Sequence, residues 1–123
     1  MGVSILIAIA VGAAAAVTIV LICLTIKKLK ELIKKRLDQK KKSKVAFGST
    51  RKIVNGHAKE ILARAPSMSM TELEDLADET PYFIVDYDAE TDEESDLAAI
   101  QAESAEENVE ALFDRNDGIV LFD

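Results

Sequence analysis

Hydrophobic and polar positions divide this chain into an uncharged N-terminal stretch, a basic middle part and an acidic C-terminal part. The 24 residues from Val3 to Ile26 carry no charge, and 20 of them are apolar. A helix of this length rises by about 36 Å, which is enough to cross a hydrocarbon layer of roughly 30 Å. The pattern therefore predicts a transmembrane helix over residues 1–26.

The positions of Lys and Arg predict the orientation of this helix. None precedes the uncharged stretch, whereas 12 of the chain's 15 lie between Lys27 and Lys52. Lys and Arg are enriched on the cytoplasmic side of membrane helices. We therefore expect a single-pass protein of the cell (inner) membrane, with its N-terminus outside and its C-terminus in the cytoplasm.

Small residues recur at every fourth position of the expected span and share one helix face. This spacing lets two helix backbones approach closely. Two interpretations stay open: a contact with a second copy or with a partner transmembrane helix, and the ordinary composition of an alanine-rich span. The candidate helix-packing residues are Ser4, Ala8, Gly12 and Ala16.

Residues 27–52 are expected to continue the span as a basic helix that ends in a turn at Gly48. Its apolar residues share one face and its lysines lie largely opposite, so the helix is amphipathic. It would either lie on anionic lipid or pair its apolar stripe with a second copy. Nucleic acid is not an expected partner, because no aromatic platform accompanies the lysines. The candidate lipid-headgroup residues are Lys27, Lys28, Lys34 and Lys35.

Residues 53–80 are expected to form two short helices. An Asn-Gly turn signal precedes the first, which starts at His57. Ser69 and Glu72 have the spacing of a capping box, which opens the second helix, and this helix ends near Glu79.

Residues 81–123 are acidic but contain two dense apolar runs. Each run is rich in β-branched and aromatic residues and is expected to be a strand, whereas the stretch between them, from Thr91 to Phe113, has helical spacing. The order allows a βαβ unit with parallel strands, or two linear motifs that become ordered on a partner. The candidate partner-binding residues are Tyr82, Phe83, Ile84, Val85, Ile119, Val120, Leu121 and Phe122.

The predicted fold class is therefore mainly α. A single transmembrane helix continues into a basic amphipathic cytoplasmic helix, and a small acidic, partly ordered region of short helices and two short candidate strands follows. The net charge of −7 conceals a strong polarity, because residues 1–64 carry 14 basic and 3 acidic groups whereas residues 65–123 carry 1 basic and 19 acidic groups.

Catalytic and cofactor signatures are missing from the sequence. It has one cysteine, one histidine, no nucleophile beside a base and no phosphate-binding glycine loop. We therefore expect neither an enzyme nor a bound cofactor. Carboxylates three positions apart give a weak metal-binding alternative, although such spacings also arise by chance in an acidic segment. The residues concerned are Glu103, Glu106, Glu107 and Glu110.

These features together predict a single-pass membrane-anchored adaptor or assembly subunit, which recruits or packs against a partner through its acidic cytoplasmic tail. The expected partners are membrane lipid, a second copy or a partner transmembrane helix, and a soluble or membrane protein bound by the tail. The alternative is a divalent-cation or mineral-binding membrane protein that uses the clustered tail carboxylates. A pore is disfavoured, because the aliphatic span has no polar lumen face.

Overall fold

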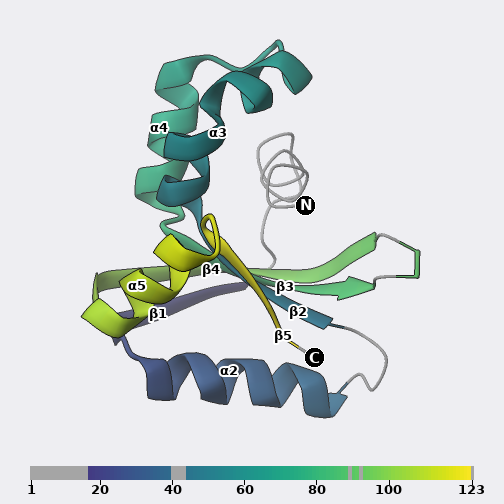
Figure 1. Ribbon diagram of the computed structural model, residues 1–123, viewed down its shortest axis with the longest axis vertical. Helices are drawn as coiled ribbons and strands as arrows, with labels where there is room; N and C mark the ends of the chain where they lie inside the picture. Colours follow the sequence, from purple (N-terminus) through teal and green to yellow (C-terminus); the bar gives the residue numbers. More distant parts are fainter. Residues whose placement is uncertain (1–16, 40–43, 89, 92, 123) are drawn as a thin grey trace.

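The chain folds around one mixed β-sheet, as a computed structural model shows for residues 17–39, 44–88, 90–91 and 93–122 (Figure 1). The strand order is β1-β4-β3-β2-β5, with β1 parallel to β4 and the other neighbours antiparallel. In chain order the elements are β1 (Val17–Leu24), α2 (Ile26–Gln39), β2 (Lys44–Ser49), α3 (Thr50–Arg64), α4 (Met70–Glu79), β3 (Tyr82–Asp88), β4 (Glu93–Ala105), α5 (Glu107–Arg115) and β5 (Ile119–Phe122).

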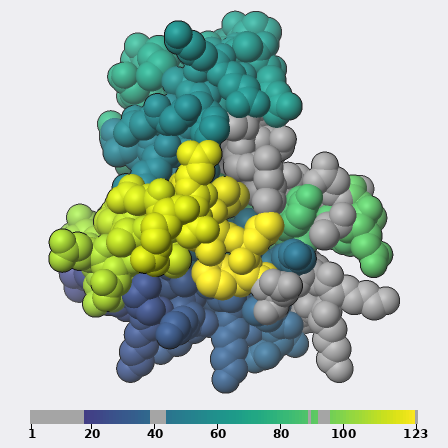
Figure 2. Space-filling model, viewed as in Figure 1, coloured from purple at the N-terminus to yellow at the C-terminus, as the bar shows by residue number. Residues whose placement is uncertain are grey.

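Helices cover both faces of the sheet, and Figure 1 shows α2 on the opposite side from α3 and α4. Leu29 and Ile33 of α2 join Phe113 of α5 in a core on one face. Ile53 of α3 and Leu73 of α4 belong to the core on the other face. In the space-filling view (Figure 2), α3 and α4 form a lobe above α5 and β5, and α2 lies below them.

The central strands contribute side chains to both cores, because successive side chains of a strand point to opposite faces of the sheet. In β2, Val45 and Phe47 belong to the core beneath α2 and α5, whereas Ala46 belongs to the other core. Gly48 pairs with Phe83 of β3. A Cβ added at Gly48 would lie 2.2 Å from Phe83 Cζ, so the buried ring occupies the space that a side chain would need.

The mainly α fold class predicted from the sequence is wrong, and so is the membrane-spanning helix. Residues 17–24, which lie in the second half of the expected span, form strand β1. No helix in the part of the chain that the structure describes is long and apolar enough to cross a bilayer. The single-pass topology and the inner-membrane location are contradicted by this arrangement. The physical reason is that β-branched residues such as Val17, Thr18 and Ile19 also suit a strand, and β4 provides the partner.

The basic helix predicted after the span is shorter than expected. α2 ends at Gln39, and residues 44–49 form strand β2 where the sequence predicted a continuing helix. The apolar stripe of α2 packs on the sheet instead of meeting lipid or a second copy. Strand β2 forms because β3 and β5 pair with it from both sides.

The two short helices predicted for residues 53–80 are present, with one boundary different. α4 starts after Ser69, whose Oγ accepts a hydrogen bond from Glu72 N at 3.2 Å, so the helix start predicted from the capping-box pattern is confirmed. α3 begins at Thr50 and runs through the predicted Asn-Gly turn, which is marked only by a kink with φ −134° and ψ 21° at His57.

The strands predicted in the acidic part are confirmed as β3 and β5, but their parallel pairing is wrong. Both lie antiparallel to β2, one on each side. The helix predicted between them is wrong over its first half, where β4 runs for 13 residues. Only α5, from Glu107 to Arg115, keeps the helical state. Ala98, Ile100 and Ala102 of β4 face the core beneath α2 and α5 with a period of two.

Candidate protein-interaction site

Among the described strands, β1 lies at one edge of the sheet (Figure 1), so part of its backbone has no strand partner among them. Glu106 N donates a hydrogen bond to Leu24 O at 2.9 Å, so the peptide groups of Leu24 point toward β4. Consecutive residues of a strand direct their N–H and C=O groups to opposite sides. The peptide groups of Ile19, Leu21 and Cys23 therefore point away from β4, and no strand among the described residues lies on that side.

The side chains of β1 are unusually apolar for an edge strand. None of the eight residues is charged or a proline. Val20 is 74% exposed and Ile22 is 80% exposed, whereas Ile19 and Leu21 pack against the core beneath α2 and α5. Edge strands of stable monomers usually carry a charge, a proline or a bulge that prevents pairing with another chain. β1 lacks the first two devices, and its register with β4 is continuous from Val17 to Leu24.

An open pocket of about 380 Å³ lies beside this edge, where α4 ends over β1 and β4. Three of its eight lining residues are carboxylates and none is basic, and the rest are apolar except for one glutamine. Gln101 of β4 donates through Nε2 to the backbone oxygen of Glu79 at 3.1 Å, which ties the end of α4 to the sheet. The lining residues are Val20, Leu21, Asp78, Glu79, Pro81, Gln101, Ala102 and Glu103.

The opposite edge of the sheet, formed by β5, is shorter than β1 and less exposed. β5 has four residues, all half-buried, and these pack against both cores. Its exposed backbone is therefore about half as long as that of β1. Of the two edges, β1 is the better template for an additional strand.

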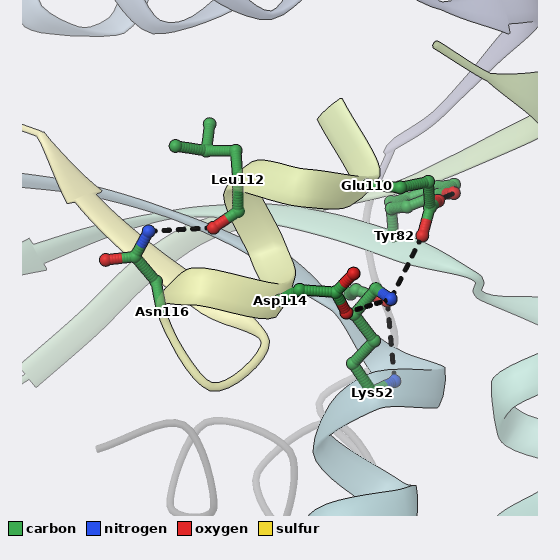
Figure 3. A network of polar contacts seen from close by, with 7 residues as sticks. Lys52, Tyr82, Glu110, Leu112, Asp114 and Asn116 are labelled. Carbon is green, nitrogen blue, oxygen red and sulfur yellow. Dashed lines mark hydrogen bonds and ion pairs between the residues drawn. The ribbon is translucent and has the colours of Figure 1, made fainter. Parts of the chain in front are cut away.

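A polar network joins α3, α5 and β3 on another part of the surface (Figure 3). Lys52 Nζ lies 2.5 Å from Asp114 Oδ1 and 3.2 Å from Glu110 Oε2, and Tyr82 Oη donates to Glu110 Oε1 at 2.6 Å. The hydrogen bond to Asp114 raises the pKa of Lys52. Burial and the hydrogen bond to Glu110 raise the pKa of Tyr82. Lys52 therefore stays charged and Tyr82 stays neutral near pH 7, so the network joins α3, α5 and β3 through a charged lysine and a neutral phenol.

A second ion pair, between α2 and β3, is nearly enclosed by the protein. Arg36 Nη1 of α2 lies 3.2 Å from Asp86 Oδ1 of β3, and these side chains are only 17% and 6% exposed. The same guanidinium nitrogen donates to the backbone oxygen of Asp96 at 2.5 Å. Arg36 therefore connects α2 to two strands of the sheet.

The residues predicted to contact lipid or another membrane helix fall in different places. The four helix-packing residues Ser4, Ala8, Gly12 and Ala16 lie outside the described residues. Of the four lysines on α2, Lys28 is half-buried and lies 3.8 Å from Glu31. The exposed ones are Lys27, Lys34 and Lys35.

The structure separates the two apolar runs predicted to bind a partner. Phe83, Ile84 and Val85 are fully buried in a central strand and Tyr82 is half-buried, so this run builds the core. The second run forms β5 at the sheet edge, with all four residues half-buried: Ile119, Val120, Leu121 and Phe122. A partner contact by these residues stays a prediction.

The glutamates predicted as a weak metal site are dispersed. Glu103 lines the pocket beside β1, and Glu107 is exposed at the start of α5. Glu106 accepts a hydrogen bond from Ile26 N at 2.7 Å, and Glu110 belongs to the network with Tyr82. No group of three His, Cys, Asp or Glu residues within the described ranges could hold a metal ion.

Sequence reasoning missed the site at β1, because the uncharged stretch was interpreted as part of a membrane helix. The alternation of exposed Val20 and Ile22 with packed Ile19 and Leu21 becomes visible only once the strand is recognised. The consecutive β-branched residues from Val17 to Val20 are the signal that could have indicated it.

Comparisons with protein-family models, with curated proteins and with solved structures find no match for this chain.

Proposed function

We propose that this chain is a protein-binding module that acts as an adaptor or assembly subunit, and that it recruits its partner by adding an extended segment of that partner to the edge of β1. The observation that carries the proposal is the uncharged edge of β1, beside which no strand of the described residues lies. Strand addition of this kind gains affinity from main-chain hydrogen bonds and specificity from alternate side chains.

Three residues of β1 provide the main-chain part of this interaction. Ile19, Leu21 and Cys23 each direct one N–H and one C=O away from β4, as follows from the hydrogen bond that Leu24 accepts on the other side. An added strand would pair with all of these groups. It would also cover Val20 and Ile22, whose exposure to water is unfavourable for side chains of this size.

A proline at position 21 tests the main-chain part directly. Leu21→Pro removes one N–H that points toward the open edge, and it leaves the bonds between β1 and β4 in place, since proline is tolerated where the N–H faces away from the ladder. Leu21→Ala is the control, because it also removes the leucine side chain beyond Cβ from the core contact but keeps the N–H.

The assay is selection of peptides from a random decapeptide display library on the full chain, followed by measurement of their affinities for the variants. We expect the selected peptides to bind the Leu21→Ala variant and to lose binding to Leu21→Pro. Hydrogen exchange should show protection of the amides of Ile19, Leu21 and Cys23 when peptide is bound. Met70→Lys, which replaces an exposed apolar residue outside the site, should leave binding unchanged. Peptides that bind all variants equally would contradict the proposal.

A further inference from the structure

The pocket beside β1 limits what the added strand can carry, provided that the proposed strand addition is correct. The pocket shares Val20 and Leu21 with the edge strand, so it borders the place where a partner strand would lie. Val20 pairs with Gln101, another residue of the pocket lining. Directly opposed residues of neighbouring strands have their Cβ atoms about 5 Å apart. Every second side chain of an added strand would therefore point to the same face as Val20, and the one directly opposite Val20 would lie beside the pocket.

The charges around the pocket favour a cation. Asp78, Glu79 and Glu103 are all exposed carboxylates, and no Lys or Arg lines the pocket. Asp78 also forms an ion pair with Arg51, which lies outside the lining. Glu79 belongs to α4 and Glu103 to β4, so the negative charge comes from two separate elements that converge on one opening.

The remaining lining suits the hydrocarbon part of a long basic side chain. Val20 and Pro81 contribute apolar side chains to the lining that the carboxylates share. Lys and Arg bury their methylene groups along such surface and keep the charged group at a polar rim. An acidic side chain in the same place would meet carboxylates of like charge, which is unfavourable.

A second copy of this chain fits the edge less well than a basic strand does. Its own β1 is uncharged and would leave the carboxylates without a counter-charge. Antiparallel pairing of two β1 strands about a two-fold axis would also bring both acidic rims near that axis. Like charges across such an interface reduce affinity.

We infer that the natural occupant of this edge is an extended protein segment in which a Lys or Arg lies among apolar residues, and that its basic side chain enters the pocket lined by Glu79 and Glu103. The main chain of the segment pairs with β1, and the basic side chain sets its register.

Synthetic peptides of alternating valine and threonine, with lysine, glutamine or glutamate at the centre, test this inference against the full chain by fluorescence anisotropy. We expect the lysine peptide to bind about tenfold more tightly than the glutamine peptide at low salt, as a charge-assisted hydrogen bond allows, and the glutamate peptide to bind least. The preference for lysine should decrease as salt is added.

Variants of the chain test whether the preference for the lysine peptide comes from the carboxylates of the pocket. Glu79→Gln and Glu103→Gln should each reduce the lysine preference severalfold, and the double variant should abolish it. Glu74→Gln, at an exposed position of α4 outside the pocket, is the matched control and should keep it.

Two outcomes would overturn the inference, and they are distinguishable from a failure of strand addition. If the three peptides bind equally and Leu21→Pro abolishes binding of all of them, strand addition holds and the basic occupant is wrong. If the chain dimerises in sedimentation and Leu21→Pro prevents this while no peptide competes, the occupant is a second copy. If Leu21→Pro changes neither peptide binding nor assembly, strand addition itself is wrong.

Discussion

Replacing Gly48 by alanine should destabilise the fold strongly, although the same substitution in a strand interior ordinarily stabilises it by reducing backbone freedom. The new Cβ would meet three atoms of the Phe83 ring at 2.2, 2.6 and 2.8 Å. Phe83 is fully buried and packs in the core with Val85 and Ile53, so the ring cannot move without displacing other core side chains.

The magnitude follows from the cost of overpacking a dense core, which is about 1–3 kcal/mol for an added methyl-sized group. The contacts at Gly48 are well below van der Waals distance, so we expect about 2 kcal/mol of lost unfolding free energy. With a urea dependence of about 1–2 kcal/mol per molar for a domain of this size, the unfolding midpoint should fall by about 1–2 M. Urea titration followed by circular dichroism measures it.

Two further variants make the result specific. Gly56→Ala, in α3, should be neutral or stabilising, because its Cβ would meet only Asp117 Oδ1 at an ordinary 3.6 Å. Phe83→Leu replaces the ring by a smaller side chain and should reduce the loss of unfolding free energy caused by Gly48→Ala. A double-mutant cycle detects this as a coupling free energy. If Gly48→Ala is as stable as the natural chain, Phe83 does not lie over Gly48 and the register between β2 and β3 is wrong.

Two predictions concern the ion pair of Arg36 with Asp86 and the hydrogen bond of Tyr82 with Glu110. Arg36→Ala should cost about 2 kcal/mol of stability, because it leaves the nearly enclosed Asp86 carboxylate without this cation, whereas exposed Lys35→Ala should change stability by less than about 0.5 kcal/mol in the same urea titration. The raised pKa of Tyr82 means that the folded chain keeps a proton which the unfolded chain releases above about pH 10, so stability should fall as pH rises beyond that point. Tyr82→Phe should reduce this fall above about pH 10, and an unchanged fall would refute the assignment to Tyr82.

The sequence correctly predicted those helices and strands that are determined by residues close together in the chain. The helix start at Ser69 was predictable, because a side chain three residues from its partner determines it. The strand at Tyr82 to Val85 was predictable, because aromatic and β-branched residues suit a strand wherever it pairs.

The elements that were predicted wrongly are strands that pair with strands far away in the sequence. The alanines of β4 have helical spacing as well as strand alternation, and β1 and β3 on either side stabilise the strand. Residues 17–24 are hydrophobic enough for a membrane, and only their pairing with β4 shows that they form an edge. The pocket could not be predicted from the sequence for the same reason, since Val20, Glu79 and Glu103 come from three distant segments.

The pairing of β1 with β4 also affects how the chain is made. Val17 pairs with Ala98, which follows it by 81 residues. At ribosomal elongation rates of about 5–20 residues per second, this strand leaves the ribosome roughly 4–16 s before its partner does. An uncharged strand without prolines is prone to pair wrongly during that interval. A nascent chain of this protein is therefore expected to depend on chaperones that bind short apolar segments until β4 has emerged.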